Sequence, residues 1–179
     1  PGDAPVGKAS PGDEPTGAAT PAAASPYRPE RIATVVGNGI GGIDVLLESH
    51  RKLLESGPGR MLPMTVPLMI SNEAAANVAM RLGLLGPAFT AVTACASGTD
   101  AIGQALDLLR SGRCDLALAG GTEAAIAEFT LGGFLRLQAL STSYNEEPER
   151  ASRPFDKDRD GFVIGEGAGI LVLEAWEKA

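Results

Sequence analysis

Short apolar runs alternate with amphipathic segments along most of the chain. Runs rich in β-branched and aliphatic residues have the character of strands, at 32–36, 88–94, 115–124 and 161–176. Between them, apolar residues recur at helical spacing, at 43–57 and 71–83, where Ser71 or Asn72 is the expected N-cap, and at 97–112. The stretch 131–140 is predicted as a short helix or turn. Alternating strands and helices predict a layered α/β fold.

Two stretches do not follow this pattern. Residues 1–29 are rich in Pro, Gly, Ala and Ser, with almost no large apolar side chains, and are predicted to form a flexible tail or linker. Residues 58–67 are punctuated by proline and are predicted to form a loop. The chain begins at Pro1 rather than Met, so we expect it to be a piece of a longer product.

Composition narrows the function classes. The 179 residues are 44% hydrophobic, which suits one ordinary soluble domain. A net charge of −7 argues against a nucleic-acid binder and gives no attraction to an anionic membrane. No apolar stretch is long enough for a membrane span. Two cysteines make no disulfide framework and, with one histidine, give no zinc-ligand spacing; a reducing, cytoplasmic location fits best.

Cys95 is the candidate nucleophile. It lies in "AVTACASGTDA", where an apolar run meets a predicted helix, so its thiol would face unpaired backbone N–H groups and the positive end of the helix dipole. Both favour the thiolate, which is the reactive form. Small neighbours leave room for a substrate. A small buried cysteine that fills core space is the alternative from position alone.

Two motifs suggest ligands that their context does not support. "GNGIGG" at 37–42 fits a dinucleotide-binding loop, but the acidic residue needed about 20 residues later would fall in a helix end and loop. A tight backbone turn is the preferred interpretation. "DKDRDGFVIGEG" at 156–167 is similar to a calcium loop, but Glu166 stands at the eleventh position and no helices flank it. We expect a turn with local side-chain hydrogen bonds.

Taken together, the motifs resemble one family, the elongating β-ketoacyl-acyl carrier protein synthases (ketosynthases) among the thiolase-like condensing enzymes. The resemblance rests on "GNGIGGID", "TACASG", "LQALST" and "ASRPFDKDRDGFVIGEGAGILVLE", in the family's order, over 30–179. It implies a thiolase-like layered α/β fold, of which this chain is the N-terminal half, incomplete at both ends. Residues 30–179 would be that domain portion and 1–29 its tail.

The resemblance also assigns roles to residues. Cys95 would accept the acyl group, and its backbone N–H would donate to the oxyanion. Ile40 matches a position that lines the acyl pocket, so it is a candidate substrate-binding residue. Thr65, a second candidate, matches a position where relatives place an aromatic residue near the dimer contact. Cys114 has no counterpart role and is predicted to be structural.

One departure from the family concerns the histidines. The family's decarboxylation step uses two histidines from the C-terminal half of the enzyme. This chain has one, His50, inside a predicted amphipathic helix, where a solvated or partly packed side chain is expected. We therefore expect the nucleophile without the decarboxylation machinery, and no condensation by this piece alone.

Partners and alternatives follow from the same resemblance. It implies an acyl carrier protein as partner, a homodimer with the strand before Cys95 near the two-fold axis, and no metal or organic cofactor. Arg110 and Arg113 are candidates for carrier contact, although arginines at a helix end also suit its dipole. The leading function is fatty acyl elongation by condensation with malonyl-carrier protein. The alternatives are a polyketide ketosynthase subunit, a non-catalytic pairing or binding relative, and a degradative thiolase.

Overall fold

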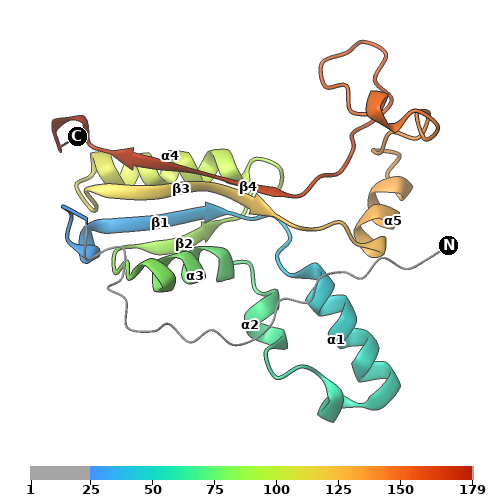
Figure 1. Ribbon diagram of the computed structural model, residues 1–179, viewed down its shortest axis with the longest axis horizontal. Helices are drawn as coiled ribbons and strands as arrows, with labels where there is room; N and C mark the ends of the chain where they lie inside the picture. Colours follow the sequence, from blue (N-terminus) through green and yellow to red (C-terminus); the bar gives the residue numbers. More distant parts are fainter. Residues whose placement is uncertain (1–24, 179) are drawn as a thin grey trace.

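A four-stranded mixed sheet forms the centre of the computed structural model, which describes residues 25–178 (Figure 1). The strand order is β2 (Ala88–Ala91), β1 (Ile32–Gly37), β3 (Leu116–Glu123) and β4 (Gly167–Glu174). The first three strands are parallel, and β4 pairs antiparallel with β3. Every residue of β1 is buried. Such two-sided burial is typical of a parallel sheet covered on both faces, and the predicted α/β class is confirmed.

Helix α4 (Ser97–Arg110) covers one face of the sheet and forms the main core with it. The core side chains are mostly alanines, which let the helix backbone lie close to the strands. They come from β1 (Ala33, Val35), β3 (Ala117, Ala119) and α4 (Ala101, Ala105, Leu108). Because side chains alternate along a strand, Thr34 and Val36 of β1 face the other side.

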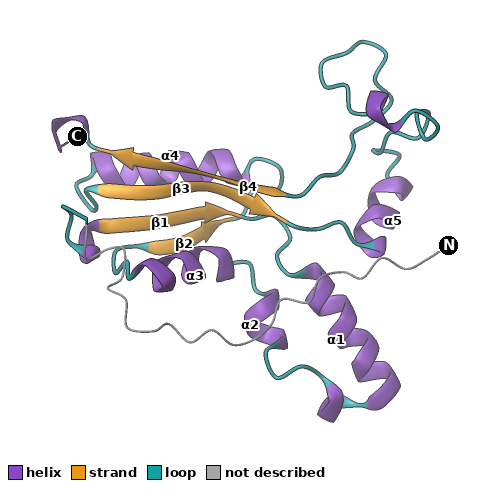
Figure 2. Ribbon diagram, in the orientation of Figure 1, coloured by secondary structure: helices purple, strands orange, loops and turns teal. Residues whose placement is uncertain are grey.

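Helix α3 (Glu73–Leu82) covers the second face, and the remaining helices lie beyond the carboxyl ends of β1 and β3 (Figure 2). Helix α3 packs against β1 and β2 and ends at Gly83, whose φ of +69° suits glycine. Figure 2 shows α1 (Ile43–Ser56), α2 (Thr65–Met69) and α5 (Glu128–Arg136) beyond the ends to which β1 and β3 point. The part of the chain that the structure describes has no helix long and apolar enough to cross a membrane.

Three predicted boundaries are wrong. The strand expected at 88–94 ends at Ala91, because the chain leaves the sheet there and Ala94 takes a φ of +52°; β2 is also an edge strand. The loop expected at 58–67 contains the start of α2, together with a 3-10 turn at Pro58–Arg60. The extended segment expected from 161 becomes a strand only at Gly167. Helices at 43–57, 71–83 and 97–112 are confirmed, although Asn72 makes no side-chain capping bond.

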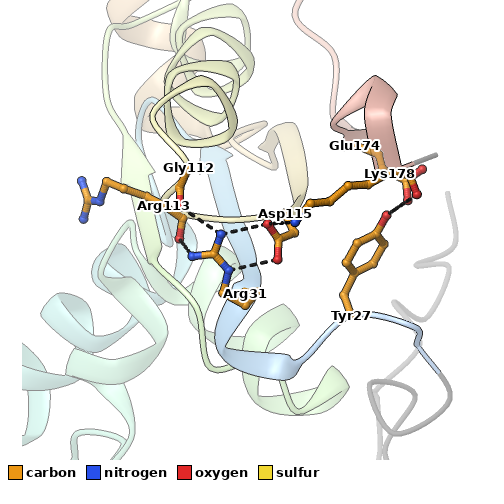
Figure 3. A network of polar contacts seen from close by, with 7 residues as sticks. All are labelled: Tyr27, Arg31, Gly112, Arg113, Asp115, Glu174 and Lys178. Atoms are coloured by element: carbon orange, nitrogen blue, oxygen red, sulfur yellow. Dashed lines mark hydrogen bonds and ion pairs between the residues drawn. The ribbon is translucent and has the colours of Figure 1, made fainter.

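A polar network joins the amino ends of β1 and β3 to the carboxyl end of the described chain (Figure 3). Arg31 donates two hydrogen bonds to Asp115, of 2.8 and 3.0 Å, and Lys178 pairs with the same carboxylate at 2.6 Å. Tyr27 donates to the Glu174 carboxylate and contacts the Lys178 carbonyl. Tyr27 belongs to the predicted tail 1–29, of which 1–24 lie outside the described residues.

Candidate active site

Cys95 lies in a tight turn between β2 and α4, at the carboxyl ends of the parallel strands. It precedes the helix by two residues and is exposed. The turn is held by Ser97, whose buried hydroxyl donates to the Ala94 carbonyl at 2.7 Å and accepts from the Thr93 N–H at 2.9 Å. Ala94, at φ +52°, carries a left-handed conformation that is costly for a residue with a Cβ. The chain therefore strains its backbone to present this cysteine.

Glycines bring the start of α4 against the ends of β1 and β3. A Cβ built on Gly37 would lie 2.2 Å from the Ser97 carbonyl carbon, and one on Gly121 would lie 3.0 Å from the Gly98 Cα. No side chain larger than hydrogen fits at Gly37 without moving backbone. The position of Cys95 is thus fixed by backbone packing directly beneath its turn.

A cavity of about 650 Å³ opens beside Cys95. This volume falls within the range of small-molecule sites, about 300–1,000 Å³. Its walls are largely apolar. Two of the lining residues, Phe134 and Phe162, stack edge to face with ring centroids 5.1 Å apart. Ile40, which is 42% exposed, lines the same cavity. The structure therefore brings Ile40 and Cys95 to one apolar space.

Glu123, the last residue of β3, also lines this cavity. Its carboxylate accepts hydrogen bonds from the backbone N–H groups of Gly39 and Ile40, both at 2.9 Å. The glycine sequence 37–42 is a turn, as predicted, with Gly41 at φ +83°. Sequence reasoning missed Glu123, because the groups it binds lie more than 80 positions away.

Thr65 and His50 lie apart from this cavity. Thr65 is buried at the start of α2, where its hydroxyl bonds Ser49 at 2.8 Å and donates to the Leu62 carbonyl at 2.7 Å. It does not line the cavity beside Cys95. His50 is exposed on α1, which agrees with the predicted solvated side chain. Among the described residues, the cavity receives no histidine.

Cys114 differs from Cys95 in its surroundings. It is 2% exposed and packs in the core under α4, and burial raises the pKa of its thiol. The prediction that Cys114 is structural agrees with this position. Arg110 and Arg113 are exposed at the far end of α4. Fourteen helical residues put that end about 20 Å from Cys95, since each residue rises about 1.5 Å.

The aspartate-rich segment forms local hydrogen bonds. Asp156 accepts from the Asp158 N–H at 2.8 Å, and Asp160 accepts from the N–H groups of Thr142 and Ser143 at 2.9 and 2.8 Å. The neighbouring Ser141 hydroxyl and the hydrogen bonds from these two amides hold the pKa of Asp160 well below its usual range. The predicted turn is confirmed. Over residues 25–178, no group of three or more potential ligands could hold a metal ion.

Comparison with known proteins identifies the family. The profile described as "Beta-ketoacyl synthase, N-terminal domain" matches residues 18–179. The chain belongs to this β-ketoacyl synthase family. The match begins inside the predicted tail 1–29, and it covers the Cys95 turn, the glycine turn and β4.

Named relatives of this β-ketoacyl synthase chain agree on one activity. The chain is 49% identical over 150 residues to "3-oxoacyl-[acyl-carrier-protein] synthase 2" of Synechocystis sp., and the match covers 84% of this chain and 36% of that protein. It is 45% identical to the mitochondrial 3-oxoacyl-[acyl-carrier-protein] synthase of Arabidopsis thaliana, covering 84% and 32%. The chain thus spans about a third of the length of these relatives.

Solved structures resemble it as well. A β-ketoacyl synthase from Burkholderia phymatum superposes with a TM-score of 0.74 at 36% identity, over 83% of this chain and 36% of that one. A type II polyketide ketosynthase, solved with its acyl-carrier protein and bound to a hexaketide, superposes with a TM-score of 0.79 at 32% identity, over 84% and 38%. These neighbours confirm the predicted thiolase-like fold of the N-terminal portion.

Proposed function

We propose that this chain carries the acyl-loading site of a 3-oxoacyl-[acyl-carrier-protein] synthase that elongates fatty acyl chains. One observation carries the proposal: the single exposed cysteine of the described residues stands at the start of α4 and opens into an apolar cavity of about 650 Å³. The family match and the names of the curated relatives support the same activity.

In the first step, the Cys95 thiolate attacks the carbonyl carbon of an acyl thioester. A bond forms between Cys95 Sγ and the acyl carbon, the carbon–sulfur bond of the donor breaks, and the released thiolate takes up a proton. The backbone N–H of Cys95 donates to the oxyanion of the tetrahedral intermediate. Cys95 stands two residues before the first residue of α4, where the backbone N–H groups of the helix start have no intrahelical acceptor. Ile40 forms part of the wall along which the acyl chain lies.

In the second step, a malonyl group on a carrier protein loses carbon dioxide, and the resulting carbanion attacks the acyl carbon on Cys95. A carbon–carbon bond forms and the Cys95 thiolate leaves. No histidine of the described residues lines the cavity, and His50 is exposed on α1. We therefore assign acyl loading to this chain, and decarboxylation to the part of its relatives' length that it does not span.

An acyl carrier protein and a second copy of the enzyme are the proposed partners. A similar ketosynthase was solved with its acyl-carrier protein, which supports the first. The homodimer is supported by β2, the strand before Cys95, which pairs only with β1 among the described strands and leaves its other edge free. Both cysteines are free thiols, which supports a cytoplasmic location.

A polyketide ketosynthase is the second candidate. The structural likeness to a ketosynthase bound to a hexaketide favours it. The identity of 45–49% to fatty acyl synthases favours elongation, because the polyketide neighbour shares only 32%. A non-catalytic pairing protein is disfavoured, since pairing does not require a strained turn that exposes a thiol to a cavity.

The test is acylation of the chain by an acyl thioester of N-acetylcysteamine, followed by intact-mass spectrometry and peptide mapping. We expect one acyl group on Cys95 and none on Cys114, because the second thiol is buried and its pKa is raised. Cys95→Ser should abolish the adduct, whereas Cys114→Ser should keep it. Equal labelling of both cysteines, or none at Cys95, would contradict the proposal.

A further inference from the structure

Glu123 has no role in the chemistry above, yet its carboxylate holds one wall of the Cys95 cavity. We propose that Glu123 is a positioning residue, which fixes the Gly39–Ile40 turn against the cavity and thereby sets the length of acyl chain that Cys95 accepts. The inference rests on the proposed function, because an acyl chain must occupy the cavity for its length to matter.

The carboxylate is bound by three donors from the glycine turn. One oxygen accepts from the N–H groups of Gly39 and Ile40 at 2.9 Å, and the other lies 3.3 Å from Asn38 Nδ2. Successive backbone N–H groups that converge in this way form an anion-binding nest. Hydrogen bonds to an ionised acceptor are roughly twice as strong as those between neutral groups. The turn is therefore built around a negative charge at this point.

Asn38 is the last residue of this segment whose backbone N–H donates to a neighbouring strand, and the next two N–H groups donate to Glu123 instead. The Asn38 N–H donates to the Ala91 carbonyl of β2 at 3.1 Å, and its side-chain amide donates to the Thr122 carbonyl of β3 at 2.8 Å. These bonds tie the three parallel strand ends together. The next two N–H groups, of Gly39 and Ile40, donate to the Glu123 carboxylate. Without it, two adjacent amides would lose their acceptor beside an apolar cavity.

The same turn lies against the nucleophile. A Cβ built on Gly39 would be 3.0 Å from the Glu123 carboxylate on one side and 3.5 Å from the Ala94 carbonyl on the other. Ala94 is the residue before Cys95, so the turn is confined between the carboxylate and the strained cysteine turn. Displacing the carboxylate releases the turn, and with it the Ile40 side chain that lines the cavity.

Acyl loading by chains of different length tests the functional consequence. We would measure initial rates of Cys95 acylation from butyryl, octanoyl and dodecanoyl thioesters of N-acetylcysteamine, using the wild type, Glu123→Gln and Glu128→Gln. Glu128 is exposed at the start of α5 and outside the cavity, so its variant is the matched control. Gln is neutral and has one acceptor oxygen in place of two, so the bond from Asn38 is lost and those from Gly39 and Ile40 are weakened. We expect Glu123→Gln to change the ratio of dodecanoyl to butyryl rates about tenfold, as for one lost hydrogen bond to a charged group, while Glu128→Gln leaves it unchanged.

Hydrogen exchange tests positioning without any acyl group. The peptide that contains Gly39 and Ile40 should lose protection in Glu123→Gln, while the peptides of α4 keep theirs. A uniform fall in rate at every chain length, with exchange unchanged at 39–40, would overturn the inference. If the wild type takes no acyl group on Cys95, the proposed function fails and the length claim with it. Exchange at 39–40 then decides alone whether Glu123 positions the turn.

Discussion

At the scale of single residues, the site depends on positions where a side chain would be too large. Gly37 is the clearest, because its Cα lies against the backbone of Ser97, the first residue of α4. Ser97 in turn closes the strained turn around Cys95 through two hydrogen bonds. A side chain at Gly37 is therefore expected to displace Ser97, and through the Ser97 hydrogen bonds the turn that carries Cys95, without disturbing the rest of the core.

Gly37→Ala should destabilise the chain and remove acyl loading together. The added Cβ would lie 2.2 Å from backbone atoms of Ser97, so α4 must shift away from β1. Overpacking of this kind costs about 1–3 kcal/mol. Gly103→Ala is the control: Gly103 lies in α4, and a Cβ built there would meet nothing within 4 Å, so this change should stabilise the chain by up to about 1 kcal/mol. Urea unfolding and Cys95 acylation measure both effects. Full acylation in Gly37→Ala would refute the coupling.

At the scale of elements, local patterns predicted most of the fold. The order of strands and helices follows from apolar periodicity. The strand–turn–helix around Cys95 could be predicted because its parts are consecutive in the sequence. The role of Glu123 could not be predicted in this way, because Gly39 and Ile40 become its neighbours only when β1 and β3 pair. The role of Thr65 stays a prediction from the resemblance; the packing of α1 on α2 puts its side chain in a buried hydrogen bond with Ser49, a contact that the local sequence does not indicate.

The amino ends of β1 and β3 give a prediction about acid stability (Figure 3). The hydrogen bonds from Arg31 and Lys178 hold the pKa of Asp115 well below its usual range. A carboxyl group with a depressed folded pKa adds stability above its unfolded value, about 3.9, and loses it as pH falls toward the folded value. The melting temperature of the wild type should therefore fall below about pH 4.

The melting temperature of Asp115→Asn should be lower than that of the wild type at neutral pH and should fall less as the pH decreases, because the variant lacks the ion pairs with Arg31 and Lys178 at every pH. Asp107→Asn is the control, since that side chain forms no ion pair within the described residues. Thermal unfolding followed by circular dichroism from neutral pH to about pH 3 compares the three proteins over the range in which carboxyl groups titrate. Parallel curves for wild type and Asp115→Asn would refute the assignment.

At the scale of the whole molecule, the two edges of the sheet differ. The outer strand β4 exposes Ile170, Leu171 and Val172, and Val172 is 65% exposed. The opposite edge, β2, is four residues long and leads directly to the cysteine turn. An unpaired strand edge is a template for pairing with another chain. The proposed homodimer assigns that pairing to β2, which would bring two cysteine turns near one axis.

Ala88→Lys tests this assignment. Ala88 is exposed at the start of β2, and lysines on an edge strand oppose pairing, because two copies would bring like charges together across the axis. The wild type should sediment as a dimer and Ala88→Lys as a monomer with a nearly unchanged melting temperature. Val172→Lys adds the same charge to the other edge of the sheet and should remain dimeric. If Val172→Lys dissociates and Ala88→Lys does not, the copies meet at β4, and the cysteine turns lie on opposite sides of the assembly.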